Sequence, residues 1–204
     1  MAYTLHKNDL PTGLKWDGSV AIDTETMGLL PIRDRLCVVQ LSKGDGNAHL
    51  VVFDGNDYSA PNLKKLLTDP KTLKIFHFAR FDVAVAKQYL DITVGPIYCT
   101  KIASRLVRTY TDRHGLKELC REMLGVDLSK QQQSSDWGSP TLTPEQCEYA
   151  ASDVLHLHRL KEKLDAMLAR TGRTQIAQSC FDFLPTRAAL DLIGWDEVDI
   201  FAHA

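Results

Sequence analysis

Residues 20–29 read VAIDTETMGL and place two carboxylates in an otherwise apolar β-strand pattern. Side chains of a strand alternate between its two faces, so Asp23 and Glu25 lie on one face, roughly 7 Å apart along the strand. Like charges at the end of a buried strand repel each other, and burial raises the cost unless a cation neutralises them. Hard cations such as Mg²⁺ and Mn²⁺ prefer carboxylate oxygens. The pattern indicates either a divalent-metal site or a strand end with both acids solvated before a turn at Gly28.

Length and composition predict a single domain over residues 1–204, since one domain typically takes roughly 100 to 200 residues. The 44% apolar and 25% charged residues are ordinary for a globular protein. No apolar run approaches the roughly 20 residues that cross a bilayer, and the first residues do not resemble a signal peptide. The five scattered cysteines form no Cys-x-x-Cys pair. We therefore expect a cytoplasmic protein with reduced thiols and no membrane partner.

The net charge of −2 and the sequence pI of about 6.4 bear on nucleic-acid binding. Proteins that hold long nucleic acid electrostatically usually carry a strongly basic domain or stripe. Any nucleic-acid partner of this chain is therefore expected to be short and held locally.

The hydrophobic pattern predicts an α/β fold with a mixed sheet flanked by helices. Residues 1–18 offer at most a short edge strand, and the segment 73–76 is expected to lie parallel to the strand at 19–23. The expected strands are 19–23, 36–42, 49–54, 73–76 and 97–99, and the expected helices are 61–67, 79–90, 100–106, 116–123, about 144–170 and 174–192. The first three strands read as an antiparallel meander, because Gly, Asp and Asn turns separate them.

The late helix has a clear start, with Thr143 as N-cap, Pro144 at the first helical position and Gln146 three residues after the cap. Tyr149 and Asp153 are four residues apart and therefore share one face of this helix. Apolar neighbours indicate that this face is buried, which favours a paired or metal-bound Asp153 over a solvated one. The apolar tail 194–204 is expected to dock on its own domain or on a neighbouring subunit.

Asp82 lies in the first turn of the helix 79–90, where an acid can simply stabilise the helix dipole. Its position after a strand end at His77 also places it near the two acids of the first strand. A cluster of such acids suits two divalent ions about 4 Å apart, which activate a water and stabilise the leaving oxygen of a phosphodiester. Tyrosine has a pKa near 10, so Tyr149 is better suited to orienting that water than to acting as a base.

These motifs resemble the DEDDy 3′–5′ exonuclease superfamily, which has a ribonuclease H-like fold. The resemblance rests on Asp-x-Glu at residues 23–25, on Asp82 after HFARF, and on Tyr-x-x-x-Asp at residues 149–153, and it covers roughly residues 18–170. Within the superfamily the chain is similar to ribonuclease D. Segments 102–104, 115–119, 135–137 and the tail also resemble the nanoRNase C family of bacterial diribonucleotide-degrading enzymes, over nearly the whole chain.

The resemblance implies that Asp23, Glu25, Asp82 and Asp153 ligate two divalent cations, Mg²⁺ or Mn²⁺, and that Tyr149 positions the water. Leu29 matches a leucine that wedges between the last two bases, although an ordinary core leucine after a turn is the alternative. Other candidates for substrate contact, each of which can equally be a surface residue, are Thr24, Met27, Gly28, His77, Arg80, Lys101, Arg108, Arg113, His114, Lys130 and Gln133.

The expected activity is a metal-dependent 3′–5′ exoribonuclease that hydrolyses dinucleotides and very short oligoribonucleotides to nucleoside 5′-monophosphates. Compared with ribonuclease D, the sequence lacks a helical nucleic-acid-binding domain after residue 204, which favours short substrates. Ribonuclease D-like trimming of longer RNA or DNA and a non-catalytic nucleic-acid-binding domain remain alternatives. The resemblance to nanoRNase C also implies a homo-oligomer, an octamer.

Overall fold

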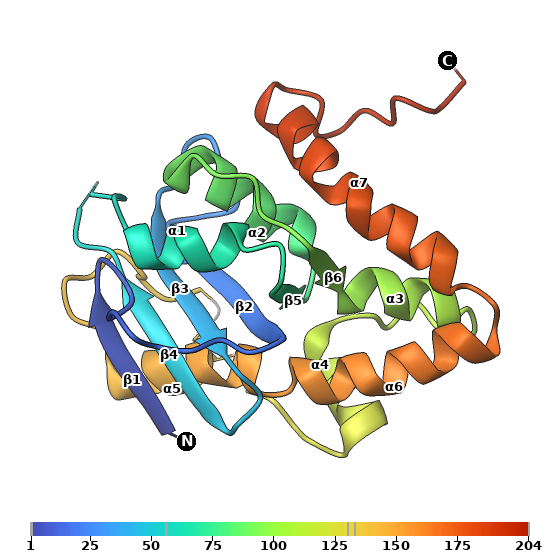
Figure 1. Cartoon of the computed structure of the whole chain (residues 1–204), viewed down its shortest axis with the longest axis horizontal. Coiled ribbons are helices and arrows are strands. Elements are labelled where there is room, and N and C mark those ends of the chain that lie inside the picture. The colour runs from blue at the N-terminus through green and yellow to red at the C-terminus, as the bar shows by residue number, and fades with distance from the viewer. Residues whose placement is uncertain (1, 56, 130, 133, 204) are drawn as a thin grey trace.

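The computed structural model describes residues 2–55, 57–129, 131–132 and 134–203. In this part of the chain a six-stranded mixed sheet runs in the order β1-β4-β3-β2-β5-β6 (Figure 1). The strands are β1 Ala2–Lys7, β2 Ser19–Thr26, β3 Leu36–Ser42, β4 Asn47–Val52, β5 Leu73–Phe76 and β6 Ile97–Cys99. The α/β prediction is confirmed, and the N-terminal segment forms the expected edge strand.

The pairing of the strands leaves half of β2 open on one side. Strand β3 is antiparallel to β2 and β4, whereas β2, β5 and β6 are parallel, as expected for the segment 73–76. The register between β2 and β5 runs from Ser19↔Leu73 to Ala21↔Ile75 and ends there. The carboxyl-terminal half of β2, which carries the two acids, therefore extends beyond β5.

Helices cover both faces of the sheet. They are α1 Pro61–Thr68, α2 Ala79–Val85, α3 Thr100–Val107, α4 Leu116–Leu119, α5 Pro144–Leu155, α6 Leu157–Arg170 and α7 Thr174–Leu192, with π-helical turns at Ala86–Leu90 and Cys120–Leu124. Helix α5 lies on one face, whereas α1 and α2 lie on the other (Figure 1). Every residue of β3 is buried because both of its faces are covered, which explains its nearly continuous apolar sequence.

The expected single helix over residues 144–170 is wrong, because the chain forms two helices separated by His156. The backbone of His156 has φ −107° and ψ −6°, which ends α5 before α6 begins. The predicted start is confirmed, since Thr143 and Gln146 form a reciprocal capping box. The break lets the two helices pack differently: α5 packs on the sheet, and α6 packs mainly against α3.

The backbone of the tail contacts side chains of α7 and α2, while the apolar side chains of the tail remain exposed. Arg187 donates to the carbonyl of Val198 at 3.3 Å, and Arg80 donates to that of Asp196 at 2.6 Å. The ring of Phe201 lies 5.8 Å from that of Phe183, yet Phe201 is 77% exposed. The tail extends away from the sheet beyond α7 (Figure 1). Within the described ranges, none of the helices combines the length and apolar character that crossing a membrane requires.

Candidate active site

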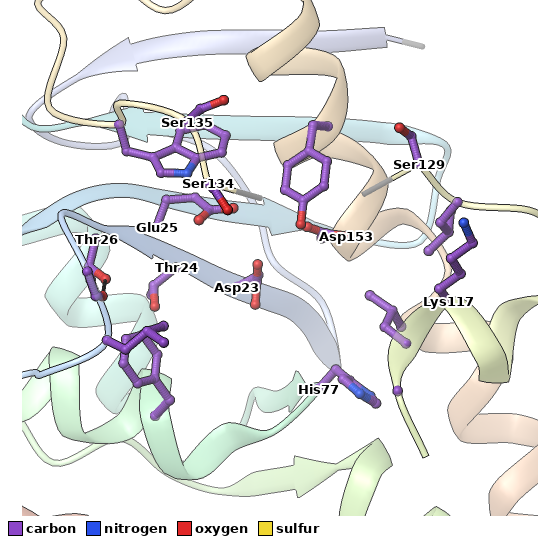
Figure 2. Close-up of a pocket in the computed structure, with 18 of the residues that line it drawn as sticks. Asp23, Thr24, Glu25, Thr26, His77, Lys117, Ser129, Ser134, Ser135 and Asp153 are labelled. Carbon is purple, nitrogen blue, oxygen red and sulfur yellow. Dashed lines mark hydrogen bonds between the residues drawn. The ribbon is translucent and has the colours of Figure 1, made fainter. Parts of the chain in front are cut away.

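Three carboxylates converge at one end of a pocket beside the sheet. Asp23 and Glu25 point to the same side of β2, and Asp153 reaches them from α5 (Figure 2). One carboxylate oxygen from each lies within 4.8 Å of the others. Residues 130 positions apart in the sequence thus form a single cluster, because α5 crosses the sheet face onto which the two β2 acids project.

The electrostatics of this acid cluster favour a bound cation. Burial, together with the charges of Asp82, Asp153 and Glu25, raises the pKa of Asp23 well above its usual value. Glu25 has a raised pKa for the same reasons, and burial raises the pKa of Asp153 to about 7. Neighbouring buried carboxylates repel each other when both are ionised, and a nearby positive charge stabilises their charged forms. Clustered oxygen donors of this kind fit a hard divalent cation such as Mg²⁺ or Mn²⁺.

Asp82 lies beside this cluster and has a second partner. Thr24, whose side chain points to the other face of β2, donates from Oγ1 to Oδ1 of Asp82 at 2.7 Å. Asp82 is only 3% exposed, and burial raises its pKa to about 7. Among the neighbouring charges, that of Asp82 has the largest effect on Asp23. Asp82 therefore lies beside the acid cluster, outside the group of three acids and outside the lining of the pocket.

Tyr149 lies one helical turn before Asp153 and faces the same pocket. Its ring packs against Trp137, with ring centroids 6.0 Å apart, and Trp137 is 3% exposed. Burial and the charges of Asp153, Glu25 and Asp23 raise the pKa of the Tyr149 hydroxyl. Tyr149 therefore remains a neutral hydroxyl, which suits a hydrogen-bonding role better than that of a base.

The turn after β2 forms the rim of the pocket. A Cβ at Gly28 would lie 2.3 Å from an Asp34 carboxylate oxygen, so this close approach requires glycine. Asp34 accepts a hydrogen bond from the backbone N–H of Leu30 at 2.9 Å, which fixes the turn. The turn presents Leu29 with 84% of its surface exposed. The core-leucine alternative for Leu29 is therefore wrong.

The pocket has a volume of about 650 Å³ and extends from the acid cluster toward His77 and Lys117 (Figure 2). Of the expected substrate-binding residues, Thr24, Met27, Gly28, Leu29, His77 and Lys101 line it. Lining residues that the sequence left without a binding role include Lys117, Ser129, Ser134, Ser135 and Trp137. Lys117 and Trp137 lie in segments that carry the family resemblance, and this was the available signal for them.

Four other expected contacts do not line the pocket. Arg80 forms a two-pronged ion pair with Asp191 of α7. Arg108 is 1% exposed and donates to Glu122 and to the carbonyl of Arg113, so it braces the loop 108–115 from inside. Their proposed substrate contact is corrected: both guanidinium groups are committed to structural partners. Arg113 and His114 also lie off the pocket wall, and Lys130 and Gln133 fall outside the described residues.

A profile of the 3′–5′ exonuclease family matches residues 7–169, and the chain belongs to this family. Ribonuclease D of Granulibacter bethesdensis is 33% identical over 169 residues, which cover 80% of this chain and 41% of that protein. The chain thus spans about two fifths of the length of this curated relative. Ribonuclease D of Escherichia coli superposes with a TM-score of 0.74 at 26% identity, over 84% of this chain and 45% of that one.

Structures of Brucella melitensis NrnC are similar to the chain over its full length. The structure of NrnC bound to pGG has 57% identity and a TM-score of 0.97, and the structure with bound Mg²⁺ has 56% identity and a TM-score of 0.95. Each covers 100% of both chains. NrnC is nanoRNase C, so the expected relationship to 3′–5′ exonucleases, to ribonuclease D and to nanoRNase C is confirmed.

Proposed function

We propose that the protein is a metal-dependent 3′–5′ exoribonuclease that hydrolyses dinucleotides and very short oligoribonucleotides to nucleoside 5′-monophosphates. The observation that carries this proposal is the convergence of Asp23, Glu25, Tyr149 and Asp153 in the pocket of a 3′–5′ exonuclease, with Asp82 bonded to Thr24 beside them. The full-length similarity to NrnC structures with Mg²⁺ and with pGG supports the same metal and substrate class.

The acids and the tyrosine have separate roles in this proposal. Asp23, Glu25, Asp82 and Asp153 hold two divalent cations, Mg²⁺ or Mn²⁺. Two such cations lower the pKa of the attacking water and stabilise the oxygen that leaves from phosphorus. The Tyr149 hydroxyl orients this water, and the packing of Trp137 against its ring keeps it in place. Thr24 holds Asp82 at the open side of β2.

The net charge of the chain and the size of its pocket support a preference for short substrates. Its net charge is −2, and its pocket of about 650 Å³ lies within the range of sites that enclose a small ligand. Leu29 projects from the rim, where it can separate the last two bases. Lys101 and Lys117 supply positive charge within the pocket. These features suit a substrate held over few nucleotides.

The tail and the assembly state belong to the same proposal. Residues 1–204 act as one unit in the cytoplasm, and the exposed apolar side chains of Trp195, Ile200 and Phe201 contact a neighbouring subunit. The resemblance to nanoRNase C makes an octamer the expected homo-oligomer. Light scattering with mass detection tests this assembly, and a monomer at micromolar concentration contradicts it.

The activity is tested by comparing hydrolysis of a 5′-labelled diribonucleotide and a 20-mer with Mg²⁺ or Mn²⁺. We expect fast conversion of the dinucleotide and slow trimming of the 20-mer. Asp82→Ala is expected to abolish turnover of both while thermal unfolding stays cooperative, and Glu162→Gln on α6 is the control that retains activity. Equal rates on both substrates contradict the length preference, and full activity of Asp82→Ala contradicts the metal mechanism.

A further inference from the structure

The imidazole of His77 is fixed in one tautomer by two hydrogen bonds at the end of β5. Its Nδ1 lies 2.9 Å from Oγ1 of Thr100, and the same hydroxyl donates to the carbonyl of Phe76 at 3.1 Å. A hydroxyl has a single proton, and a carbonyl can only accept. Because Thr100 gives that proton to Phe76, it must accept from His77. Nδ1 of His77 therefore carries the proton.

The other ring nitrogen, Nε2, is then a hydrogen-bond acceptor. No group within the described ranges forms a hydrogen bond with Nε2, and His77 lines the pocket. Burial, with Lys101 and His114 nearby, lowers the pKa of His77 to about 3, so the ring stays neutral at physiological pH. Lys101 and Lys117, which also line the pocket, offer only donors. His77 thus adds an acceptor to a region otherwise suited to anions.

The chemistry of an RNA fragment limits what this acceptor can bind. A phosphate oxygen would place a lone pair against the lone pair of Nε2, so phosphate is unsuited to it. N–H groups of the bases differ among the four nucleotides, whereas every nucleotide of RNA carries sugar hydroxyls that can donate. An exonuclease that degrades mixed sequences needs contacts that all four nucleotides can make.

We propose that Nε2 of His77 accepts a hydrogen bond from a sugar hydroxyl of the bound substrate. This inference rests on the proposed function, and it specifies which part of the substrate His77 contacts. Thr100 is the positioning residue, because it holds the proton on the opposite nitrogen. A site that forms a hydrogen bond with a specific substrate hydroxyl discriminates against analogues that lack this hydroxyl, because the polar group of the site is then left unpaired.

The test measures kcat/KM for a diribonucleotide and for analogues that lack one hydroxyl each: the 2′-OH of the first sugar, the 2′-OH of the second, or the 3′-OH. For the unaltered protein, loss of the contacted hydroxyl is expected to lower kcat/KM by about 10- to 100-fold. His77→Phe keeps the ring volume and removes the acceptor. The penalty for that one analogue should then shrink to about two-fold or less, while the penalties for the others persist.

Thr100 provides a second variant that leaves the imidazole in place. Thr100→Val removes the acceptor for the Nδ1 proton, so the proton can move to Nε2 and the discrimination should fall. Thr100→Ser should restore it. Nitrogen-15 NMR of labelled histidine at neutral pH should show His77 protonated on Nδ1 in the unaltered protein and in Thr100→Ser, but a mixture in Thr100→Val. A merely structural role of Thr100 would change stability without changing this tautomer.

Different results contradict the role of His77 and the proposed function. An Nε2-protonated ring in the unaltered protein, or an analogue penalty that is the same in His77→Phe, contradicts the role of His77. Absence of dinucleotide hydrolysis contradicts the proposed function instead. In that case NMR and calorimetric binding of the same analogues, with Ca²⁺ in place of Mg²⁺, still decide the role of His77, because neither requires turnover.

Discussion

The two ends of the pocket respond to burial in different ways. At the acid end, Asp23, Glu25 and Asp153 have raised pKa values and repel one another. At the other end, burial lowers the pKa values of His77 and Lys101, and a hydrogen bond fixes the tautomer of the histidine. The first arrangement needs added cations, whereas the histidine of the second is neutral without one. Chemistry and recognition are therefore separate within one pocket, and variants at the two ends should affect different kinetic constants.

The largest effect is expected at the acid end. Asp153→Asn keeps the size of the side chain and removes one negative charge from the cluster, so it should lower kcat by about 1,000-fold or more at saturating Mg²⁺. Steady-state kinetics on a dinucleotide measure the loss, with Glu162→Gln as a charge-matched control on α6. Activity within ten-fold of the unaltered protein would show that Asp153 is not needed for catalysis.

A smaller loss is expected for Tyr149→Phe, which removes only the hydroxyl. The ring still packs against Trp137, so the fold and the KM should change little. Because the hydroxyl orients the water, kcat should fall by about 100-fold. A KM that rises while kcat is unchanged would show that Tyr149 contributes to substrate binding and not to the chemical step.

At the recognition end, Lys117→Met retains an unbranched side chain and removes the charge. We expect the KM for a dinucleotide to rise about ten-fold while kcat stays within about two-fold, because the charge attracts the substrate in both ground and transition states. The rise should diminish at high salt. Lys65→Met, on the exposed last turn of α1, is the matched control. A selective fall in kcat for Lys117→Met contradicts the separation of the two ends.

The smallest effect concerns the stability of the metal-free protein. Asp82 and Asp153 have folded-state pKa values of about 7, above the ordinary value of 3.8. The folded state keeps protons that the unfolded state has already lost, so the free energy of unfolding should decrease as pH rises from about 4 to about 7. Thermal unfolding in EDTA measures this decrease, and Mg²⁺ at pH 8 should reverse it. A flat profile in EDTA would mean that the acids are not desolvated.

Local patterns predicted much of the fold. The bounds of β3, β6 and α7 agree with the expected segments 36–42, 97–99 and 174–192, because apolar periodicity and turn residues act over short distances. The break at His156 escaped prediction, since neither proline nor glycine marks it. Sequence also placed Asp23 and Glu25 on one face, because strand alternation is a local property.

The sequence by itself determined which acids belong together, the hydroxyl that accompanies them, and the exonuclease family. Only the tertiary structure decided which donors face the pocket: Lys117 does, whereas Arg80 and Arg108 are held by acidic partners elsewhere. It also decided the hydrogen bond of Thr24 to Asp82 and the tautomer of His77. The physical reason is that a long polar side chain pairs with groups that folding brings close to it. The spacing of residues along the chain does not reveal which groups these are.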